Sequence, residues 1–361
     1  MKIFILTPSA FPAPTGNAMT VERWRDSLAG VGATVRVISM ENREKTALAR
    51  LIDEERPDLL HAHHLLKSGY PLLEHPLADR LHSIPLVVSP AGTDINKQAS
   101  GPVLSEKAVA VCSVANAIIT QSTWLFDLLR KALPGHHEKM QFIPKSFRWL
   151  GNDPFDAKSR MQWNRDLCLF LCPAGVRPVK NNLACLHLME EVYRLRPHVR
   201  ILFAGPVLDE EYAARFEREI NRCASFARWT EHIPPAAMRS AYESADIVLN
   251  ASQSEGLSNT LLEAIVAGKP ILASRIPGNE WPVMGDDGKA PCGFLFDLDN
   301  SADFIEKAII LIDDAAVCRR FSDFCRIRAA RLPSPEDEAD ALLQIYRQVI
   351  EFSDVRSLSR S

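Results

Sequence analysis

The sequence has no long apolar run. None of its hydrophobic stretches approaches the roughly 20 residues that a membrane-spanning helix requires. The apolar part of Met1–Pro8 is also too short for a signal peptide, and its residues are typical of a first β-strand. We therefore expect a protein without a transmembrane segment that works in the cytoplasm, although its surface can still contact a membrane peripherally.

Paired cysteines are absent as well. The eight cysteines are scattered along the chain, and none forms a Cys-x-x-Cys pair. Structural zinc sites need clustered ligands, and disulfide frameworks belong to oxidising compartments, so neither is expected here. We predict free, buried thiols in a reducing compartment and no metal site.

The chain also lacks an excess of one charge. Its 42 Lys and Arg residues against 45 Asp and Glu residues give a net charge of -3, so we expect no nucleic acid as partner. What it has is an ordinary globular composition, with 47% hydrophobic and 24% charged residues. Its 361 residues exceed what one hydrophobic core usually organises, so two domains are expected.

Short apolar runs alternate with amphipathic segments along the first half of the chain. Continuous apolar runs are typical of strands that are covered on both faces. Repeated alternation of strand and helix predicts a parallel, doubly wound sheet. The predicted strands of this half are residues 3–7, 34–39, 59–63, 86–89, 117–121 and 141–144.

The same pattern restarts after a polar segment, residues 151–165, which is broken by Gly and Pro and is a linker candidate. We therefore predict an α/β protein with two Rossmann-like domains, residues 1–155 and 156–334, that face each other across a cleft. An amphipathic helix is expected over residues 335–353. The predicted strands of the second half are residues 168–172, 201–204, 247–250 and 271–273.

The candidate site residues lie in loops after strands, because doubly wound sheets bind ligands at the carboxyl ends of their strands. The first loop lacks the G-x-G-x-x-G dinucleotide fingerprint but reaches Gly16 before a helix. Its backbone amides can contact a phosphate, or the loop is a simple turn. Asp94, after the fourth strand, can accept hydrogen bonds from sugar hydroxyls or can cap a turn.

Three histidines follow the third strand, His61, His63 and His64. Strand geometry puts the first two on one face and the third elsewhere, and no carboxylate or cysteine completes a metal-binding set. Two interpretations stay open: one histidine lines the cleft as a hydrogen-bond donor, or all are ordinary, partly buried residues.

The first loop of the second domain carries two cations, Arg177 and Lys180. A planar guanidinium fork and a point charge at a strand end suit a diphosphate. Such charges can stabilise the negative charge that grows on a departing nucleoside diphosphate. The alternative is a solvated loop.

Two glutamates eight positions apart, Glu255 and Glu263, flank a predicted helix start. The backbone amides of Gly256–Ser258 would lie at the N-terminus of that helix, where anions are favoured. A carboxylate on the helix can accept hydrogen bonds from two vicinal hydroxyls, such as ribose O2 and O3. The alternative is that Glu255 caps the helix and Glu263 lies on a solvated face of it.

The segment from Ser254 through Ala264, followed by Gly268-Lys269-Pro270, resembles the signature of the retaining glycosyltransferases of family 4, which have the two-domain GT-B fold. Gly92-Thr93-Asp94 and Ile276-Pro277-Gly278-Asn279 fall in the expected order, so the resemblance covers the whole chain. Among small members, the chain is most similar to the glycosyltransferase 1 domain-containing proteins.

The resemblance implies a role for each residue. Glu255 would face the hexose, Glu263 would hold the ribose, and the C-terminal helix would pack back on the first domain. Transfer would retain the anomeric configuration, use a UDP-sugar as the first candidate donor, and require neither a metal nor a cofactor. The expected donor-binding residues are Gly16, Asn17, Gly175, Arg177, Lys180, His232, Ile233, Glu255, Gly256, Leu257, Ser258 and Glu263, and the expected catalytic residues are Glu255, Lys180, Arg177, His61 and Asp94.

The chain departs from the family pattern at two positions. Ala91 stands where many members carry a sugar-contacting histidine; either His61 or His63 substitutes for it, or the role is missing. Gly175 stands where many members carry the diphosphate arginine, so Arg177 is displaced by two positions. The acceptor, which can be a small molecule, a lipid or a glycan, and the oligomeric state are left open.

Three other functions remain compatible with this sequence. One is a selenosugar- or thiosugar-forming synthase of the same fold, because Gly16-Asn17 followed by Arg23-Trp24 is loosely similar to such enzymes. Another is a sugar-nucleotide epimerase or hydrolase, for which no convincing acid and base set is visible. The third is a non-catalytic nucleotide-sugar-binding protein, which the replaced histidine would suit.

Overall fold

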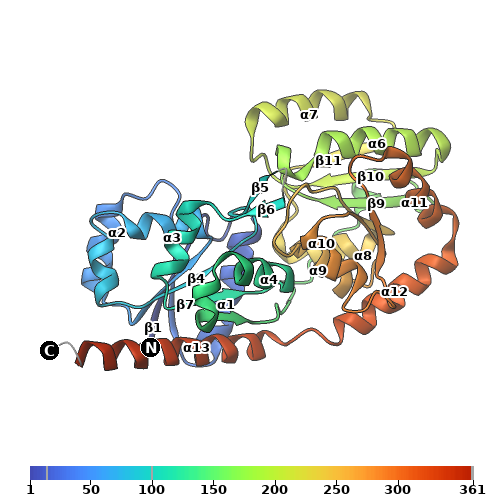
Figure 1. Ribbon diagram of the computed structural model, residues 1–361. Coiled ribbons are helices and arrows are strands. Elements are labelled where there is room, and N and C mark those ends of the chain that lie inside the picture. Colours follow the sequence, from blue (N-terminus) through green and yellow to red (C-terminus); the bar gives the residue numbers. More distant parts are fainter. Residues whose placement is uncertain (14, 99–100, 359–361) are drawn as a thin grey trace. The chain divides into compact units, whose positions relative to one another are not determined.

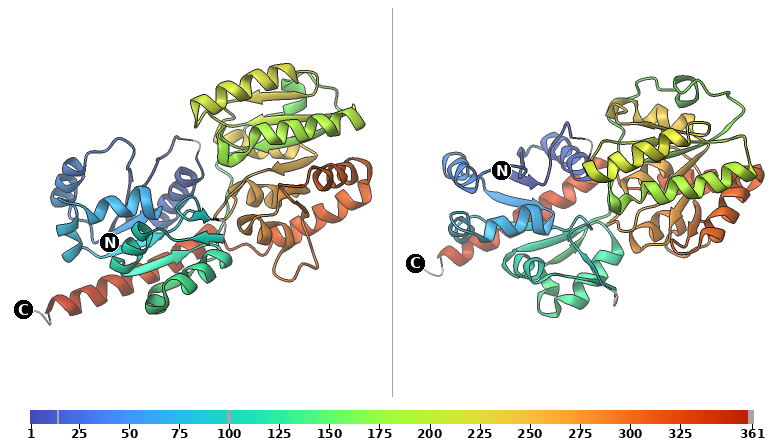
Figure 2. Two further views of the ribbon diagram at one scale, coloured as in Figure 1. Left: turned by 45° about the horizontal axis from the view of Figure 1, so that its top comes forward. Right: turned by 90° about the horizontal axis from the view of Figure 1, so that it is seen from above.

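A computed structural model describes residues 1–13, 15–98 and 101–358, and it divides the chain into two compact units. Unit 1 comprises Met1–Arg148 together with the C-terminal stretch that begins at Pro333. Unit 2 is Trp149–Leu332. Each unit is built around one parallel sheet with helices on both faces (Figures 1 and 2).

The sheet of unit 1 has six parallel strands in the order β2-β1-β3-β4-β7-β8. The chain moves outward in one direction from β1 and then crosses back to continue in the other, which is a doubly wound arrangement. The strands are β1 (Lys2–Thr7), β2 (Thr34–Ser39), β3 (Leu59–His63), β4 (Leu86–Ser89), β7 (Ala117–Thr120) and β8 (Met140–Phe142).

Alternation along β1 separates two cores in unit 1. Phe4 and Leu6 join a cluster with residues of α2, α3 and α4, whereas Ile3 and Ile5 join a cluster with residues of α1 and α13. Successive strand side chains point to opposite faces, so each face of the sheet is closed by its own helices. The helices are α1 (Gly16–Gly30), α2 (Lys45–Glu55), α3 (Glu106–Val114), α4 (Thr123–Ala132) and α13 (Pro335–Leu358).

Short elements complete unit 1. The most irregular part of this unit follows β3, where one π-helical turn and two 3-10 turns precede β4. The short elements are η1 (Leu65–Gly69), η2 (Tyr70–Leu73), η3 (Ala78–His82), η4 (Pro134–Lys139) and the antiparallel pair β5 (Asn96–Gln98) and β6 (Gly101–Val103).

The sheet of unit 2 repeats the plan, with six parallel strands in the order β11-β10-β9-β12-β13-β14. Phe170 and Cys172 of β9 face a core with α6, α7 and α11, and Leu169 and Leu171 face a core with α8, α9 and α10. The strands are β9 (Cys168–Pro173), β10 (Val199–Ala204), β11 (Ala227–Thr230), β12 (Ile247–Asn250), β13 (Ile271–Ser274) and β14 (Gly293–Phe296).

The helices of unit 2 are arranged on both faces of its sheet, as the yellow-green and orange ribbons of Figure 2 show. They are α5 (Ala157–Arg160), η5 (Pro178–Lys180), α6 (Asn182–Leu195), α7 (Glu210–Arg222), η6 (Pro235–Ala237), α8 (Met238–Ser244), α9 (Asn259–Val266), α10 (Pro277–Met284), α11 (Ser301–Asp313) and α12 (Ala315–Ala329).

The prediction of two doubly wound parallel sheets is confirmed. The division between the units falls after Arg148, whereas the sequence analysis placed it at residue 155. Residues 149–155 pack within unit 2: the Trp149 ring lies 5.6 Å from that of Tyr242, and Phe155 is 5% exposed in the same core. Apolar side chains inside a polar, Gly- and Pro-broken segment account for the difference.

Candidate active site

The predicted site residues of unit 2 lie in loops after two neighbouring strands. Arg177 and Lys180 follow β9, and Glu255 follows β12, which pairs directly with β9. The carboxyl ends of adjacent parallel strands meet at one sheet edge, so the two loops come together. A backbone hydrogen bond of 2.8 Å from the Gln253 amide to the Val179 carbonyl joins them.

Lys180 and Glu255 form an ion pair, although they lie 75 positions apart in the sequence. The pair is largely enclosed, with side chains 17% and 12% exposed. The Glu255 oxygen that contacts Lys180 also accepts hydrogen bonds from the Ser252 hydroxyl at 2.7 Å and from the side-chain amide of Asn250 at 3.4 Å. Burial alone would raise the pKa of Glu255, but Lys180 and these donors outweigh it and lower the pKa. Glu255 is therefore ionised at neutral pH.

Arg177 lies close enough to Glu255 for an electrostatic interaction between them. Burial lowers the pKa of the Arg177 guanidinium, and the Glu255 charge opposes that shift. The Arg177 Nε–H is buried and has no hydrogen-bond partner among the described residues. Buried donors are normally paired, so this one has capacity for an acceptor oxygen.

A buried polar network supports Glu255 from beneath. The side-chain oxygen of Asn250, Oδ1, accepts from the Ser252 backbone amide at 3.0 Å and from the Asn279 side-chain amide at 3.3 Å. Asn279 also donates to the Ser274 backbone carbonyl at 3.1 Å. The ends of β12 and β13 and the first turn of α10 thus converge under the glutamate.

Sequence reasoning missed Asn250, Ser252 and Asn279 as parts of the site. A signal was present, because Asn250 ends an otherwise apolar strand and Asn279 follows Pro277-Gly278 at a helix start. Gly278 has its own steric reason: a Cβ there would overlap the Glu255 carbonyl group. Only a glycine allows α10 to approach the Glu255 loop this closely.

The loop after β12 leads into α9 through Ser258. Gly256 and Ser258 are buried and Leu257 is half-buried. Ser258 occupies the N-cap position of α9 without a side-chain capping bond. Its hydroxyl accepts instead from the side-chain amide of Asn250 at 3.1 Å. The N-terminus of α9 therefore lies at the same sheet edge as Lys180.

Glu263 lies further along α9 and is half-buried. Its carboxylate is hydrogen-bonded to the hydroxyl of Tyr242, a fully buried residue that the sequence analysis did not single out. Burial, with a contribution from Glu263, raises the pKa of Tyr242 well above its usual range. The Tyr242 hydroxyl also lies 3.3 Å from the Thr260 carbonyl, so Glu263 is oriented by a buried neighbour.

The remaining predicted residues of unit 2 have different surroundings. Gly175 is half-buried, and a Cβ there would come within 2.5 Å of the Leu208 side chain. His232 is exposed, whereas Ile233 is 6% exposed and belongs to the core with α8 and α9. Of the two, His232 is the one whose side chain is open to a ligand.

Gly16 and Asn17 begin α1 in unit 1. Gly16 is exposed, Asn17 is half-buried, and the Thr15 hydroxyl caps the helix by accepting from the Ala18 amide at 3.2 Å. The first turn of a 15-residue helix is thus presented at the carboxyl end of β1.

The structure corrects the expectation that His61 contacts substrate. His61 is fully buried, and both ring nitrogens are engaged: Nδ1 lies 2.6 Å from the Tyr346 hydroxyl and Nε2 lies 3.0 Å from the Ser89 hydroxyl. The imidazole stacks on Trp24 with the ring centroids 5.1 Å apart. Burial lowers the pKa of His61 to about 3, so it is a neutral core residue.

Asp94 is likewise a structural residue rather than a sugar ligand. It is fully buried, and its carboxylate accepts from the backbone amides of Leu65 at 2.7 Å, Gly92 at 2.8 Å and Ala91 at 3.1 Å. These bonds hold the turn after β4 against η1. These contacts are the ones that the turn-capping alternative predicts.

The other two histidines are buried too. His63 is 5% exposed and lies 2.8 Å from the Ser89 hydroxyl. His64 is 3% exposed, accepts from the Lys67 amide at 3.2 Å and lies 3.3 Å from the Thr93 hydroxyl. Burial lowers the pKa of both imidazoles. All three histidines are therefore part of the interior of unit 1.

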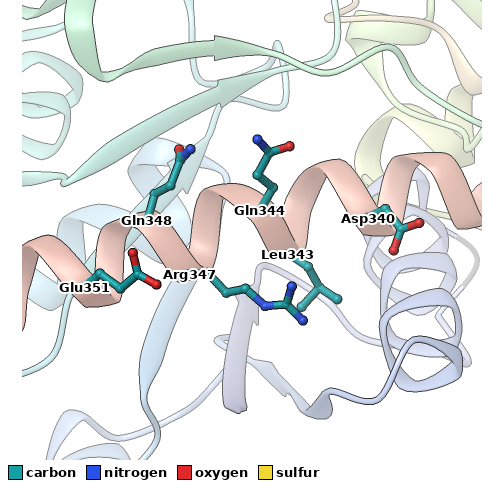
Figure 3. Close-up of a pocket in the computed structure, with 6 residues that line it drawn as sticks. All are labelled: Asp340, Leu343, Gln344, Arg347, Gln348 and Glu351. Atoms are coloured by element: carbon teal, nitrogen blue, oxygen red, sulfur yellow. The ribbon is translucent and has the colours of Figure 1, made fainter.

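Within the described ranges, no group of three or more His, Cys, Asp or Glu side chains is placed to hold a metal ion. The same residues contain no helix that is long and apolar enough to cross a membrane. The pocket drawn in Figure 3 is formed by one helix, α13, and contains none of the predicted site residues. Its lining residues are Asp340, Leu343, Gln344, Arg347, Gln348 and Glu351.

Comparison with known families covers both units. Residues 4–145 match the family described as "Glycosyl transferase 4-like domain", and residues 169–314 match "Glycosyl transferases group 1". Glycosyltransferase 1 domain-containing protein 1 of Xenopus tropicalis is 24% identical over 326 residues, which are 89% of this chain and 90% of that protein.

Solved structures share the fold at low sequence identity. Sucrose-phosphate synthase from Thermosynechococcus elongatus superposes with a TM-score of 0.77 at 16% identity, covering 97% of this chain and 99% of that one. The Anabaena protein HepE, solved in complex with UDP-glucose, has a TM-score of 0.73 at 17% identity, covering 98% and 100%. The fold of each unit is therefore one that these proteins share.

Proposed function

The chain belongs to the family 4-like glycosyltransferases with the GT-B fold, and from this premise we propose that it transfers a hexose from a nucleotide-sugar donor to a small-molecule, lipid or glycan acceptor. In this proposal the first candidate donor is a UDP-sugar, the anomeric configuration is retained, and neither a metal nor a cofactor takes part.

One observation carries the proposal. A lysine and a glutamate from the ends of adjacent strands meet at the sheet edge of unit 2, with Arg177 beside them. This arrangement places two cations in one loop and pairs one of them with a carboxylate of the neighbouring loop. Cations suit a diphosphate and a carboxylate suits sugar hydroxyls, so a nucleotide sugar matches both halves.

Each residue then has a role in binding the donor. Lys180 and Arg177 hold the diphosphate together with the amides at the start of α9, where the helix dipole favours an anion. Glu263 accepts from the ribose hydroxyls, and its contact with Tyr242 orients it. The nucleotide base lies near His232, which is exposed at the end of the loop after β11.

The chemistry proposed for these residues is electrostatic. When the glycosidic bond to the diphosphate breaks, negative charge develops on the leaving phosphate oxygens. Fixed cations and backbone amides in an enclosed site stabilise that charge in the transition state. No side chain of the cluster is a convincing nucleophile, and Glu255 is paired with Lys180 as an ionised group, so we assign it to hydroxyl binding rather than to acid or base catalysis.

The choice of a UDP-sugar rests on similarity in fold. The HepE structure contains UDP-glucose, and this chain matches it over 98% of its length. That protein is only 17% identical, so the likeness supports a nucleotide sugar as the donor class and UDP-glucose as the first compound to test.

Thermal-shift measurements against UDP-, GDP-, ADP- and TDP-sugars test the donor. A ligand at 100 times its Kd stabilises the native state by about 2.7 kcal/mol, which is readily detected. We expect one nucleotide to raise the Tm, and mass spectrometry should then detect donor hydrolysis or transfer to candidate acceptors, selenophosphate included. Absence of any shift with all four nucleotides would contradict the proposal. NMR of the product's anomeric proton tests retention.

A further inference from the structure

The main cation of the proposed diphosphate site already has an anionic partner within the protein. Lys180 forms its ion pair with Glu255 in a largely enclosed position. An incoming diphosphate needs the same ammonium group. It must either take Lys180 from Glu255 or share it, and sharing brings two anions into one small volume.

The side chain of Glu255 is held in one position by its neighbours. Ser252 and Asn250 donate to the same carboxylate oxygen as Lys180. The α10 backbone at Gly278 lies against the Glu255 main chain. An anion that enters beside Lys180 therefore competes with a fixed, ionised carboxylate for the same ammonium group, and each anion weakens the hold of the other on it.

A nucleotide sugar compensates for this competition, whereas a bare nucleoside diphosphate does not. The hydroxyls of a hexose are donors that can replace Lys180 on Glu255. A nucleoside diphosphate removes or shares the lysine and offers no such donors, so it leaves a buried carboxylate less well satisfied. Buried charges that lose partners are costly.

We infer that Glu255 is a specificity-determining residue that discriminates the sugar-bearing donor from the nucleoside diphosphate product, by competing with the product for Lys180. This inference rests on the proposed function. Glu255 then has a second role besides hexose binding. Once the sugar has left, Lys180 returns to Glu255, and the carboxylate thereby assists release of the nucleoside diphosphate.

Calorimetric titrations of the Glu255→Gln variant with UDP and with UDP-glucose test the inference. If the thermal-shift screen selects another nucleotide, that nucleoside diphosphate and its sugar replace this pair. The amide keeps the size of the side chain and removes its charge. We expect the variant to bind UDP about tenfold more tightly and UDP-glucose more weakly than the unchanged protein. Inhibition of transfer by UDP should strengthen in parallel.

Glu243→Gln is the matched control. Glu243 pairs with Arg239 at 2.8 Å on α8, and its side chain is 48% exposed, so it loses the same charge outside the site. We expect its affinities for both ligands to be unchanged. Circular dichroism and the Tm confirm folding, and Glu255→Ala provides a second charge-removing variant if the glutamine variant does not fold.

A Lys180→Met background separates competition from general repulsion. If Glu255 acts by holding Lys180, adding Glu255→Gln to Lys180→Met should give no further gain in UDP affinity. A gain that persists in full, or UDP binding to Glu255→Gln that is no tighter than to the unchanged protein, would overturn the inference. Failure of the unchanged protein to bind any of the nucleotides tested would instead contradict the proposed function itself.

Discussion

The indole N–H of Trp24 donates a 2.6 Å hydrogen bond to the carboxylate of Glu338, which lies 314 positions later in the chain. Glu338 is 2% exposed and also accepts from the Ser146 amide at 3.0 Å and from the side chain of Gln121. Arg23 forms an ion pair with it at 3.4 Å. The first turn of α13 is thereby attached to α1 and to the end of the first sheet.

Glu338→Ala should destabilise unit 1. The substitution removes the acceptor for several buried donors and leaves Arg23 without its partner, which costs on the order of 3 kcal/mol. Calorimetric or urea unfolding measures the loss. Glu336→Ala is the control, because Glu336 pairs with Arg148 where both side chains are 55% exposed, and it should change stability little. Equal stabilities of the two variants would contradict the role of Glu338.

The same carboxylate should make unit 1 sensitive to acid. Burial alone would raise the pKa of Glu338, but Arg23 and the hydrogen bonds outweigh it and lower the pKa below its ordinary value of 4.5. A lowered folded-state pKa stabilises the protein above about pH 4.5, and the stabilisation is lost as the pH falls further. Glu338→Gln should therefore flatten the decline in unfolding free energy below pH 4.5, and an unchanged slope would argue against it.

Glu263→Ala should weaken nucleotide-sugar binding and leave the fold intact. Hydrogen bonds to a charged group are worth about 1.5–3 kcal/mol, which corresponds to roughly a ten- to hundredfold loss of affinity. Tyr242 keeps the Thr260 carbonyl as a neighbour, so the buried hydroxyl is not left without an acceptor. Isothermal titration measures the affinity. An unchanged Kd would show that Glu263 does not hold the ribose.

His61→Ala should reduce stability without changing donor affinity, because His61 lies in the interior of unit 1. Loss of its contacts with Tyr346 and Ser89 should cost on the order of 2 kcal/mol. The folded-state pKa is about 3, below the usual 6.5, so this histidine stabilises the protein above pH 6.5 and less as the pH falls. The variant should lose part of that pH dependence; a large increase in donor Kd would restore a role in binding.

Chelation should leave transfer activity unchanged. The proposed mechanism stabilises the leaving diphosphate with Lys180, Arg177 and backbone amides. We expect the same rate in EDTA as in its absence, measured on protein dialysed against chelator. Complete loss of activity that a divalent ion restores would contradict the metal-free mechanism.

Much of the fold was predictable from local sequence. The predicted strands 59–63 and 247–250 coincide with β3 and β12, which lie inside their sheets and are buried along their whole length. The predicted strand 34–39 coincides with the edge strand β2, in which Val35, Val37 and other β-formers alternate with polar residues. The sequence analysis missed β11 and β14, which are the edge strands of their sheet. β11 carries half-exposed residues at Arg228-Trp229-Thr230, and the apolar part of β14 is only Phe294-Leu295-Phe296, which follows Gly293.

The sequence by itself determined the alternation of strands and helices and the loops that carry Arg177, Lys180, Glu255 and Glu263, because both follow from neighbouring residues. Only the tertiary structure decided their partners. Adjacent pairing of β9 and β12 brings Lys180 to Glu255, and packing of α13 beneath the first sheet seals His61 against Tyr346, 285 positions away. Strand alternation indicates that His61 and His63 share a face, but which helix covers that face depends on contacts between distant segments.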